Sequence, residues 1–173
     1  MSNSQQAAVF ADMVLTHAWN GSIPVDPIAI AKSFGINVAY DDLPSDVSGA
    51  LVKTKEMKSP IILVDNSEPD VRKRFTIAHE IGHYVYNTAV LQLNDYEKID
   101  YRNDKSSDGQ NEEEVFANNF AAALLMPSSF LKSANLQIGV HRIELASRLK
   151  VSLEALNYRI NTFIKGGGFV DGE

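Results

Sequence analysis

A histidine–glutamate–histidine motif is the feature of this sequence with the clearest chemistry. Residues 79–83 read HEIGH. Two histidines four positions apart lie on the same face of a helix, where both imidazoles can bind one cation at about 2.0–2.1 Å. Glu80 lies at the edge of that face, where it can reach a water on the metal but not the metal itself. The motif therefore predicts a zinc site in which the glutamate takes a proton from the water.

Chance and ordinary packing are the alternatives to a metal site at this motif. The chain has only 4 histidines among 173 residues, and random placement would give roughly 0.005 such motifs in a chain of this composition. Ile77, Ile81 and Val85 form a separate apolar stripe that would pack the helix into a core. Gly82 costs about 1 kcal/mol relative to alanine in a helix, which indicates a close approach of another segment or simple packing there.

A catalytic zinc ion also needs a third protein ligand and an open position for water. Three consecutive glutamates, Glu112, Glu113 and Glu114, open a later predicted helix. Glu114 and Asn118 lie one turn apart on one face, so Glu114 could bind the metal while Asn118 holds a ligand histidine by a hydrogen bond. Glu113 remains the competing ligand, and all three acids could instead complement the positive end of the helix dipole. The spacing favours Glu114.

The elements around these residues form a predicted α+β fold. Apolar periodicity predicts helices, while short β-branched runs between turn residues predict strands. Helices are expected over residues 4–19, 26–34, 69–87, 112–126, 139–150 and 152–164, and strands over residues 36–40, 49–53 and 61–64. Strands followed by a run of helices favour an α+β fold over alternating βαβ units. The strand 61–64 could be a sheet edge to which an extended substrate adds, or it could pair on both sides.

Composition limits the classes of protein and of partner. The net charge is −6, which disfavours broad electrostatic binding to nucleic acid or to anionic membranes. The chain has no cysteine, so disulfides, thiol nucleophiles and cysteine-bound metals are excluded. No segment approaches the ~18 consecutive apolar residues that span a bilayer, and no secretion signal precedes residue 21. We therefore expect a cytoplasmic protein without membrane contact.

Two longer segments resemble a known family. The segments RKRFTIAHEIGHYVYN and EEEVFANNFAAALLMP are similar to those of the ImmA/IrrE family of zinc metallopeptidases, and the resemblance covers roughly residues 20–165. It implies a zincin-like (gluzincin-like) core in which a small three-stranded sheet packs on the metal-binding helix. It also implies Zn²⁺ as cofactor, with His79 and His83 as ligands, Glu80 as general base and a glutamate before the Ala117–Asn118 pair as third ligand.

The resemblance further implies a function. Members of the family cleave, or are thought to cleave, helix-turn-helix repressors of the Xre type, and they occur in phages, mobile elements, stress-response loci and toxin–antitoxin-like pairs. We therefore expect a zinc-dependent endopeptidase that cleaves a specific partner protein of this kind. The alternative is a non-proteolytic binding module, or the toxin-like half of a pair with a helix-turn-helix antitoxin, in which zinc is structural or vestigial.

The C-terminal part is expected to be a helical appendage to the catalytic domain. Residues 144–160 look like half of a DNA-reading helix-turn-helix, with Lys150 where such motifs place a turn glycine. Direct DNA binding is not expected, and the two helices would instead cap the core or dock the partner. The expected organisation is a metallopeptidase domain over residues 1–135 with a mobile polar loop at 94–111, the appendage over 136–165 and a flexible tail over 166–173.

Sequence alone leaves open which side chain steadies the negative charge that develops on a cleaved peptide carbonyl. His17 and His141 are candidates, although each could be an ordinary surface or packing histidine. Tyr84 and Tyr86, close to the motif, are equally compatible with this role.

Overall fold

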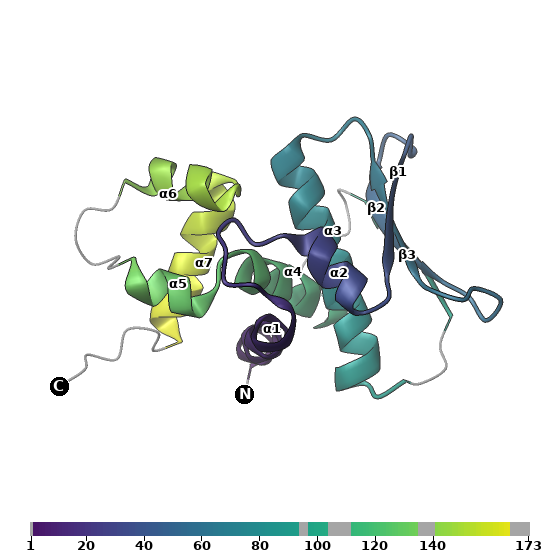
Figure 1. The fold of residues 1–173 in the computed structure, drawn as a ribbon, viewed down its shortest axis with the longest axis horizontal. Coiled ribbons are helices and arrows are strands. Elements are labelled where there is room, and N and C mark those ends of the chain that lie inside the picture. Colours follow the sequence, from purple (N-terminus) through teal and green to yellow (C-terminus); the bar gives the residue numbers. More distant parts are fainter. Residues whose placement is uncertain (1, 94–96, 104–111, 135–140, 167–173) are drawn as a thin grey trace.

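The helices of the described chain lie to one side of a small sheet (Figure 1). The structure is a computed structural model that describes residues 2–93, 97–103, 112–134 and 141–166. The helices in this part of the chain are α1 (Asn3–Ala18), α2 (Pro27–Ser33), α3 (Asp70–Val85), the π-helix η1 (Tyr86–Val90), α4 (Glu112–Leu125), α5 (Ser128–Ser133), α6 (Arg142–Leu149) and α7 (Leu153–Lys165). The strands are β1 (Asn37–Asp41), β2 (Val47–Lys53), β3 (Ile61–Asp65) and β4 (Lys98–Asn103). The α+β class is confirmed.

The sheet has four strands in the order β1-β3-β2-β4. β1 is parallel to β3, while β2 is antiparallel to β3 and β4. The three predicted strands are present, and of the two alternatives for 61–64 the structure has the strand that pairs on both sides, not the sheet edge. The strand β4 lies inside the segment predicted as a mobile loop, and residues 94–96 and 104–111 of that segment fall outside the described part of the chain. The sequence of β4 has two apolar residues, Ile99 and Tyr101, which alternate with polar ones. This alternation is too short to identify a strand within a polar stretch of sequence.

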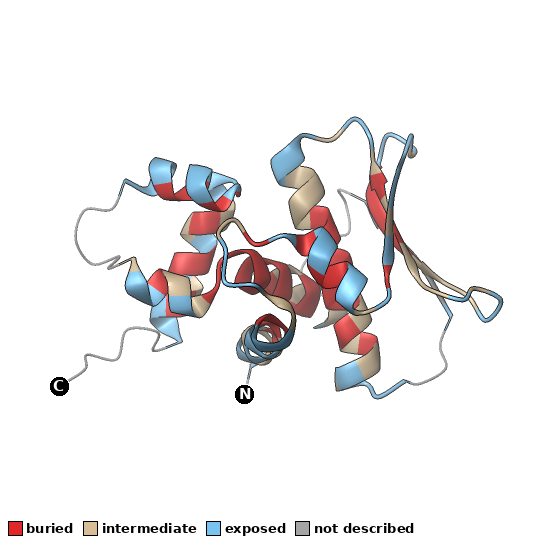
Figure 2. Cartoon of the chain, viewed as in Figure 1, coloured by how far each residue is buried: buried red, intermediate tan, exposed pale blue. Residues whose placement is uncertain are grey.

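The helix α4 is the centre of the core. It packs against α1 and α3 (Figure 1) and it is buried on all sides from Phe116 to Leu125, except at Asn118. A helix that is apolar around its whole circumference is expected in a core rather than at a surface. Figure 2 shows the buried residues concentrated on α4 and on the part of α3 that it contacts. The core therefore lies where the two helices with the candidate metal ligands meet.

Contact with the sheet fixes the position of α3. A β-carbon placed on Gly49 of β2 would collide with Thr76 Cγ2 of α3 and would lie 2.8 Å from Leu63 O. Glycine is therefore needed for this close approach of the strand to the helix. Thr76 lies about one turn before His79, so the contact sets the height of the histidines relative to the sheet.

Local sequence signals explain where α2 begins and ends. The Asp26 carboxylate accepts hydrogen bonds from the backbone N–H groups of Ile28 and Ala29, and Pro27 occupies the first turn. After the helix, Gly35 adopts a φ of +71°, a conformation that glycine reaches without steric cost. The chain then turns directly into β1.

The C-terminal helices contact the core through two arginines. Arg74 of α3 donates hydrogen bonds to the backbone carbonyls of Val25 at 2.6 Å and of Lys150 at 3.3 Å. Arg159 of α7 donates to the backbone carbonyl of Met126 at 3.4 Å and, at 3.0 Å, to a serine hydroxyl of α5. These contacts join α6 and α7 to α3 and to the end of α4. The sequence did not predict α5, and the expected domain boundary at residue 135 lies outside the described residues.

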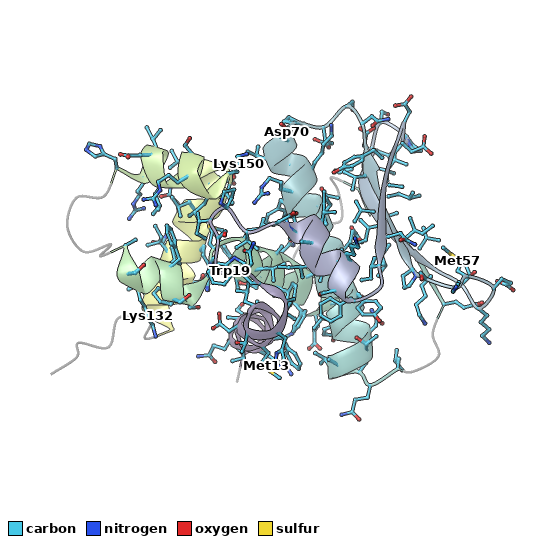
Figure 3. The ribbon with its side chains drawn as sticks, in the orientation of Figure 1. Met13, Trp19, Met57, Asp70, Lys132 and Lys150 are labelled. Atoms are coloured by element: carbon cyan, nitrogen blue, oxygen red, sulfur yellow. The ribbon has the colours of Figure 1, made fainter. Side chains whose placement is uncertain are left out.

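Lys150 lies at the C-terminal end of α6 (Figure 3). Its backbone is in the left-handed conformation, with φ 52° and ψ 52°. The backbone thus makes the turn that helix-turn-helix motifs usually make at a glycine, although a lysine occupies the position. Within the described residues, no helix combines the length and apolar character that crossing a bilayer requires.

Candidate metal centre

The helices α3 and α4 bring His79, His83 and Glu114 together. The Nε2 atoms of the two histidines on α3 lie 2.9 Å apart. Glu114, in the first turn of α4, has one carboxylate oxygen 3.5 Å from His79 Nε2 and the other 3.2 Å from His83 Nε2. One ligand atom from each of the three residues can be chosen within 4.8 Å of the others. The three residues favoured by spacing in the sequence are therefore neighbours in the fold.

These three side chains fit a divalent metal ion such as zinc. Two imidazole nitrogens and a carboxylate oxygen form a donor set that zinc commonly takes. A tetrahedral zinc ion with bonds of about 2.0–2.2 Å keeps its ligand atoms about 3.3–3.5 Å apart, and the separations here are 2.9–3.5 Å. The histidines are 0% and 2% exposed, while the Glu114 side chain is 15% exposed. The cluster is thus buried on the histidine side and reaches the surface through Glu114.

Hydrogen bonds from α4 orient both imidazole rings. His79 Nδ1 lies 3.0 Å from Asn118 Oδ1, and His83 Nδ1 lies 2.9 Å from Glu113 Oε1. Since an amide oxygen and a carboxylate only accept hydrogen bonds, both Nδ1 atoms would carry the proton. Each Nε2 atom then presents its lone pair to the cluster, which is the tautomer that metal binding requires. Asn118 occupies the position expected from its spacing, and Glu113 acts on His83 from outside the cluster.

Asn87 is a further member of this network that sequence reasoning missed. Its Nδ2 atom donates to the His83 backbone carbonyl at 2.9 Å and to Glu113 Oε1 at 2.8 Å. The side chain is 7% exposed and belongs to η1, the π-helix that continues α3. Asn87 therefore fixes the carboxylate that in turn fixes His83. The spacing of four residues from His83 was the signal available in the sequence.

Close packing of α3 and α4 makes these contacts possible. Gly82, between the two histidines, faces the backbone of Ala117 on α4. Phe120 of α4 also faces Gly82, and the Phe116 ring packs against Phe120 and Phe10, with ring centroids 6.1 Å and 6.0 Å apart. The close approach expected from a glycine in the motif is thus present.

Glu80, the candidate general base, directly follows His79 on α3 and is 1% exposed. A carboxylate at this depth is uncommon in proteins unless it has a partner or a function. Its role as general base beside the candidate ligand His79 stays a prediction.

The four candidates for steadying a developing oxyanion lie in different places. His17 lies on α1, His141 directly precedes α6 and Tyr84 packs against α2. Tyr86 instead lies beside the start of α4, with its ring centroid 5.2 Å from that of Phe116. Burial raises the pKa of Tyr86, and the first two glutamates of α4 add to this, so its hydroxyl keeps its proton at neutral pH. Both tyrosines are thus near the cluster, because Tyr84 lies on α3 directly after His83 and Tyr86 begins η1 directly after α3.

The fold and the cluster define an α+β protein with a buried His–His–Glu site suited to a divalent metal. The family model of the IrrE N-terminal-like domain, Peptidase_M78, matches residues 31–161. The chain belongs to this family. The resemblance noted from the two motif segments is thereby confirmed, and the family's name points to a metallopeptidase.

Comparison with solved structures shows a similar fold in a larger protein. A Mycobacterium tuberculosis transcriptional regulator matches with a TM-score of 0.61 at 18% sequence identity. The match covers 91% of this chain and 46% of the regulator, so the chain spans less than half the length of that protein. None of the curated proteins matches the chain.

Proposed function

We propose that this protein is a zinc-dependent endopeptidase with a zincin-like, gluzincin-like core. The observation that carries the proposal is the convergence of His79 and His83 from α3 with Glu114 from α4 at separations suited to one ion. Membership of a peptidase family supports it. The hydrogen bonds from Asn118 and Glu113 support it further, because they set the histidine tautomer that a metal needs.

The residues of the chain have distinct tasks in this proposal. His79, His83 and Glu114 would hold the zinc ion, which when bound lowers the pKa of a coordinated water and polarises a peptide carbonyl. Glu80 would take a proton on its carboxylate and return it to the amine that leaves. Burial of Glu80 and of the histidines excludes bulk water and strengthens electrostatic interactions within the site.

We further propose a protein partner of the helix-turn-helix repressor type. The resemblance to ImmA/IrrE proteins suggests this partner, and the net charge of −6 fits a protein partner better than DNA. Such repressors bind DNA, so the proposal places this chain in the cytoplasm. The alternative is a binding module in which the cluster has a structural role. This alternative has no specific observation in its favour, and the two functions differ in the need for Glu80.

The test compares wild type with Glu80→Gln, which keeps the size of the side chain and one acceptor oxygen but cannot take the proton. Each protein is loaded with zinc and incubated with the repressor encoded beside the gene, and any cut is located by intact mass. A single cut by wild type and none by Glu80→Gln, at equal zinc content, is the expected result. The matched control is Glu56→Gln, an exposed glutamate in the turn after β2, which should cut as wild type does. Equal cutting by wild type and Glu80→Gln would contradict the endopeptidase function, and efficient digestion of casein would contradict a specific partner.

A further inference from the structure

A cavity of about 660 Å³ lies beside the candidate metal centre, between α3, α4 and α7. Its wall includes Phe75 from α3, Val115 and Asn118 from α4, and Ala155 and Tyr158 from α7. The volume is within the range of about 300–1,000 Å³ typical of ligand sites in proteins. The cavity thus joins the two ligand-bearing helices to the C-terminal helices.

The inner wall of the cavity consists of neighbours of the metal ligands. The Phe75 ring centroid lies 6.4 Å from that of His79, and Asn118 Oδ1 lies 3.0 Å from His79 Nδ1. Val115 directly follows Glu114 in the first turn of α4. Phe75 and Asn118 each lie about one helical turn, or about 5.4 Å along the axis, from a candidate ligand, so the cavity flanks the Nδ1 side of the His79 ring.

The outer wall is fixed to α4 by hydrogen bonds. The Tyr158 hydroxyl donates to Asn119 Oδ1 at 3.3 Å, and Asn119 Nδ2 donates to the Val115 backbone carbonyl at 2.7 Å. Tyr158 is nevertheless 51% exposed, so it closes the cavity from the solvent side without being part of the core. The helix α7 therefore takes part in the shape of the site, although it carries no candidate ligand.

The lining favours an apolar occupant. Valine, alanine and phenylalanine side chains supply much of it. Its two charged residues, Arg72 and Glu154, have opposite signs, so neither a cationic nor an anionic group is favoured by net charge. Since most ligand pockets combine apolar walls with a few polar groups, a bulky apolar side chain fits this lining best.

We infer that this cavity binds a large apolar side chain of the substrate, adjacent to the peptide bond that is cleaved. The inference rests on the proposed endopeptidase function and names the residue class at one substrate position. It assigns to α7 the selection of that side chain, through Ala155 and Tyr158. Burying a large apolar side chain is worth about ten- to a hundredfold in affinity, which makes the prediction measurable.

The test uses small hydroxamates, whose chelating group binds zinc directly. Two pairs of probes are used, because the apolar side chain could lie on either side of the cleaved bond. The first pair is phenylalanine hydroxamate with glycine hydroxamate, and the second is benzylsuccinyl hydroxamate with succinyl hydroxamate. Affinities for the zinc-loaded protein are measured by calorimetry. In at least one pair, the benzyl group should raise the affinity about tenfold or more.

Variants of the outer wall then locate the effect. Ala155→Trp fills the cavity and should abolish the gain from the benzyl group, while the unsubstituted probe of the same pair binds as before. Tyr158→Ala removes a wall at an exposed position and should reduce the gain several-fold. Asn161→Trp, an exposed site on α7 away from the cavity, is the matched control and should keep the full gain.

The outcomes separate the two proposals. If zinc-loaded wild type binds neither unsubstituted probe, the metal site fails, and the endopeptidase function and this inference fall together. If the unsubstituted probes bind but the benzyl group brings no gain, the inference alone is wrong. It is equally overturned if the gain persists in both Ala155→Trp and Tyr158→Ala.

Discussion

A β-carbon on Gly82 would lie 2.9 Å from the Cα atom of Ala117 and 3.1 Å from its carbonyl oxygen. Both distances are shorter than the contacts that carbon atoms normally make in proteins, near 3.5–4.0 Å. The helices α3 and α4 therefore touch backbone to backbone between the two candidate ligand histidines. Glycine is required here by its neighbour, since Gly82 lies inside a regular helix.

Gly82→Ala should destabilise the protein although alanine is the better helix former. The helix propensity would favour alanine by about 1 kcal/mol, but separating two packed backbones should outweigh it and give a net loss of about 1–3 kcal/mol. Urea denaturation of the metal-free protein measures this change. The double variant Gly82→Ala/Ala117→Gly should not recover the loss, because the obstructing atoms belong to the backbone. A single variant as stable as wild type would contradict the packing described here.

Glu114 and Glu113 should differ in their effect on zinc binding. Glu114→Ala removes a ligand and should abolish stoichiometric zinc, as should His79→Ala and His83→Ala. Glu113→Ala leaves the three ligands and removes only the acceptor that holds His83, so affinity should fall about 10–100-fold. Chelator competition measures both. Loss of zinc in Glu113→Ala with retention in Glu114→Ala would show that the ligand register is shifted by one residue.

Asn87→Ala should weaken zinc binding without removing any ligand. The change leaves the Glu113 carboxylate without the donor that holds it 2.9 Å from His83 Nδ1, so we expect an affinity up to about tenfold lower. Asn161→Ala, which removes an exposed asparagine from α7, is the control and should bind zinc as wild type does. Equal affinities in the two variants would show that the Asn87 amide has no effect on the site.

Lys150→Gly should stabilise the protein. In the left-handed conformation at φ 52°, lysine is destabilised sterically by roughly 1–2 kcal/mol. Glycine avoids this strain, but it makes the unfolded chain more flexible. The expected net gain is about 0.5–1 kcal/mol, measured by thermal or urea denaturation. Lys132→Gly on α5 is the matched control, because that lysine lies inside a helix and the change should destabilise by about 1 kcal/mol. A loss of stability in Lys150→Gly would contradict this account.

The parts of the fold with strong local signals could be predicted from the sequence. The cap at Asp26, the apolar circumference of α4 and the short β-branched strands each have a local cause. The strand β4 and the helix α5 could not be predicted, because their pattern is weak or short. The strand β4 pairs with β2, a partner distant in the sequence, and such pairing overrides local propensity.

The candidate site could likewise be predicted only in part from the sequence. Helical spacing was sufficient to relate His79 to His83 and Glu114 to Asn118, since each pair lies on one helix. The role of Glu113 depends on how α3 and α4 are rotated relative to each other, which no spacing within one helix determines. The contact of Asn87 with Glu113 depends on this rotation as well, and on the π-helical turn that continues α3.

The strand β4 lies in the stretch of chain between the two ligand-bearing helices. His83 and the glutamate at its Nδ1 atom are 30 positions apart, and η1 and β4 lie between them. An ion bound by both helices would hold the two ends of this stretch together, so the stretch would gain less entropy when it opens locally. Removing the ion would therefore favour local opening, starting with the strand held by a single neighbour rather than with α4 in the core. In this way the metal would contribute to the integrity of the sheet at a strand that it does not contact.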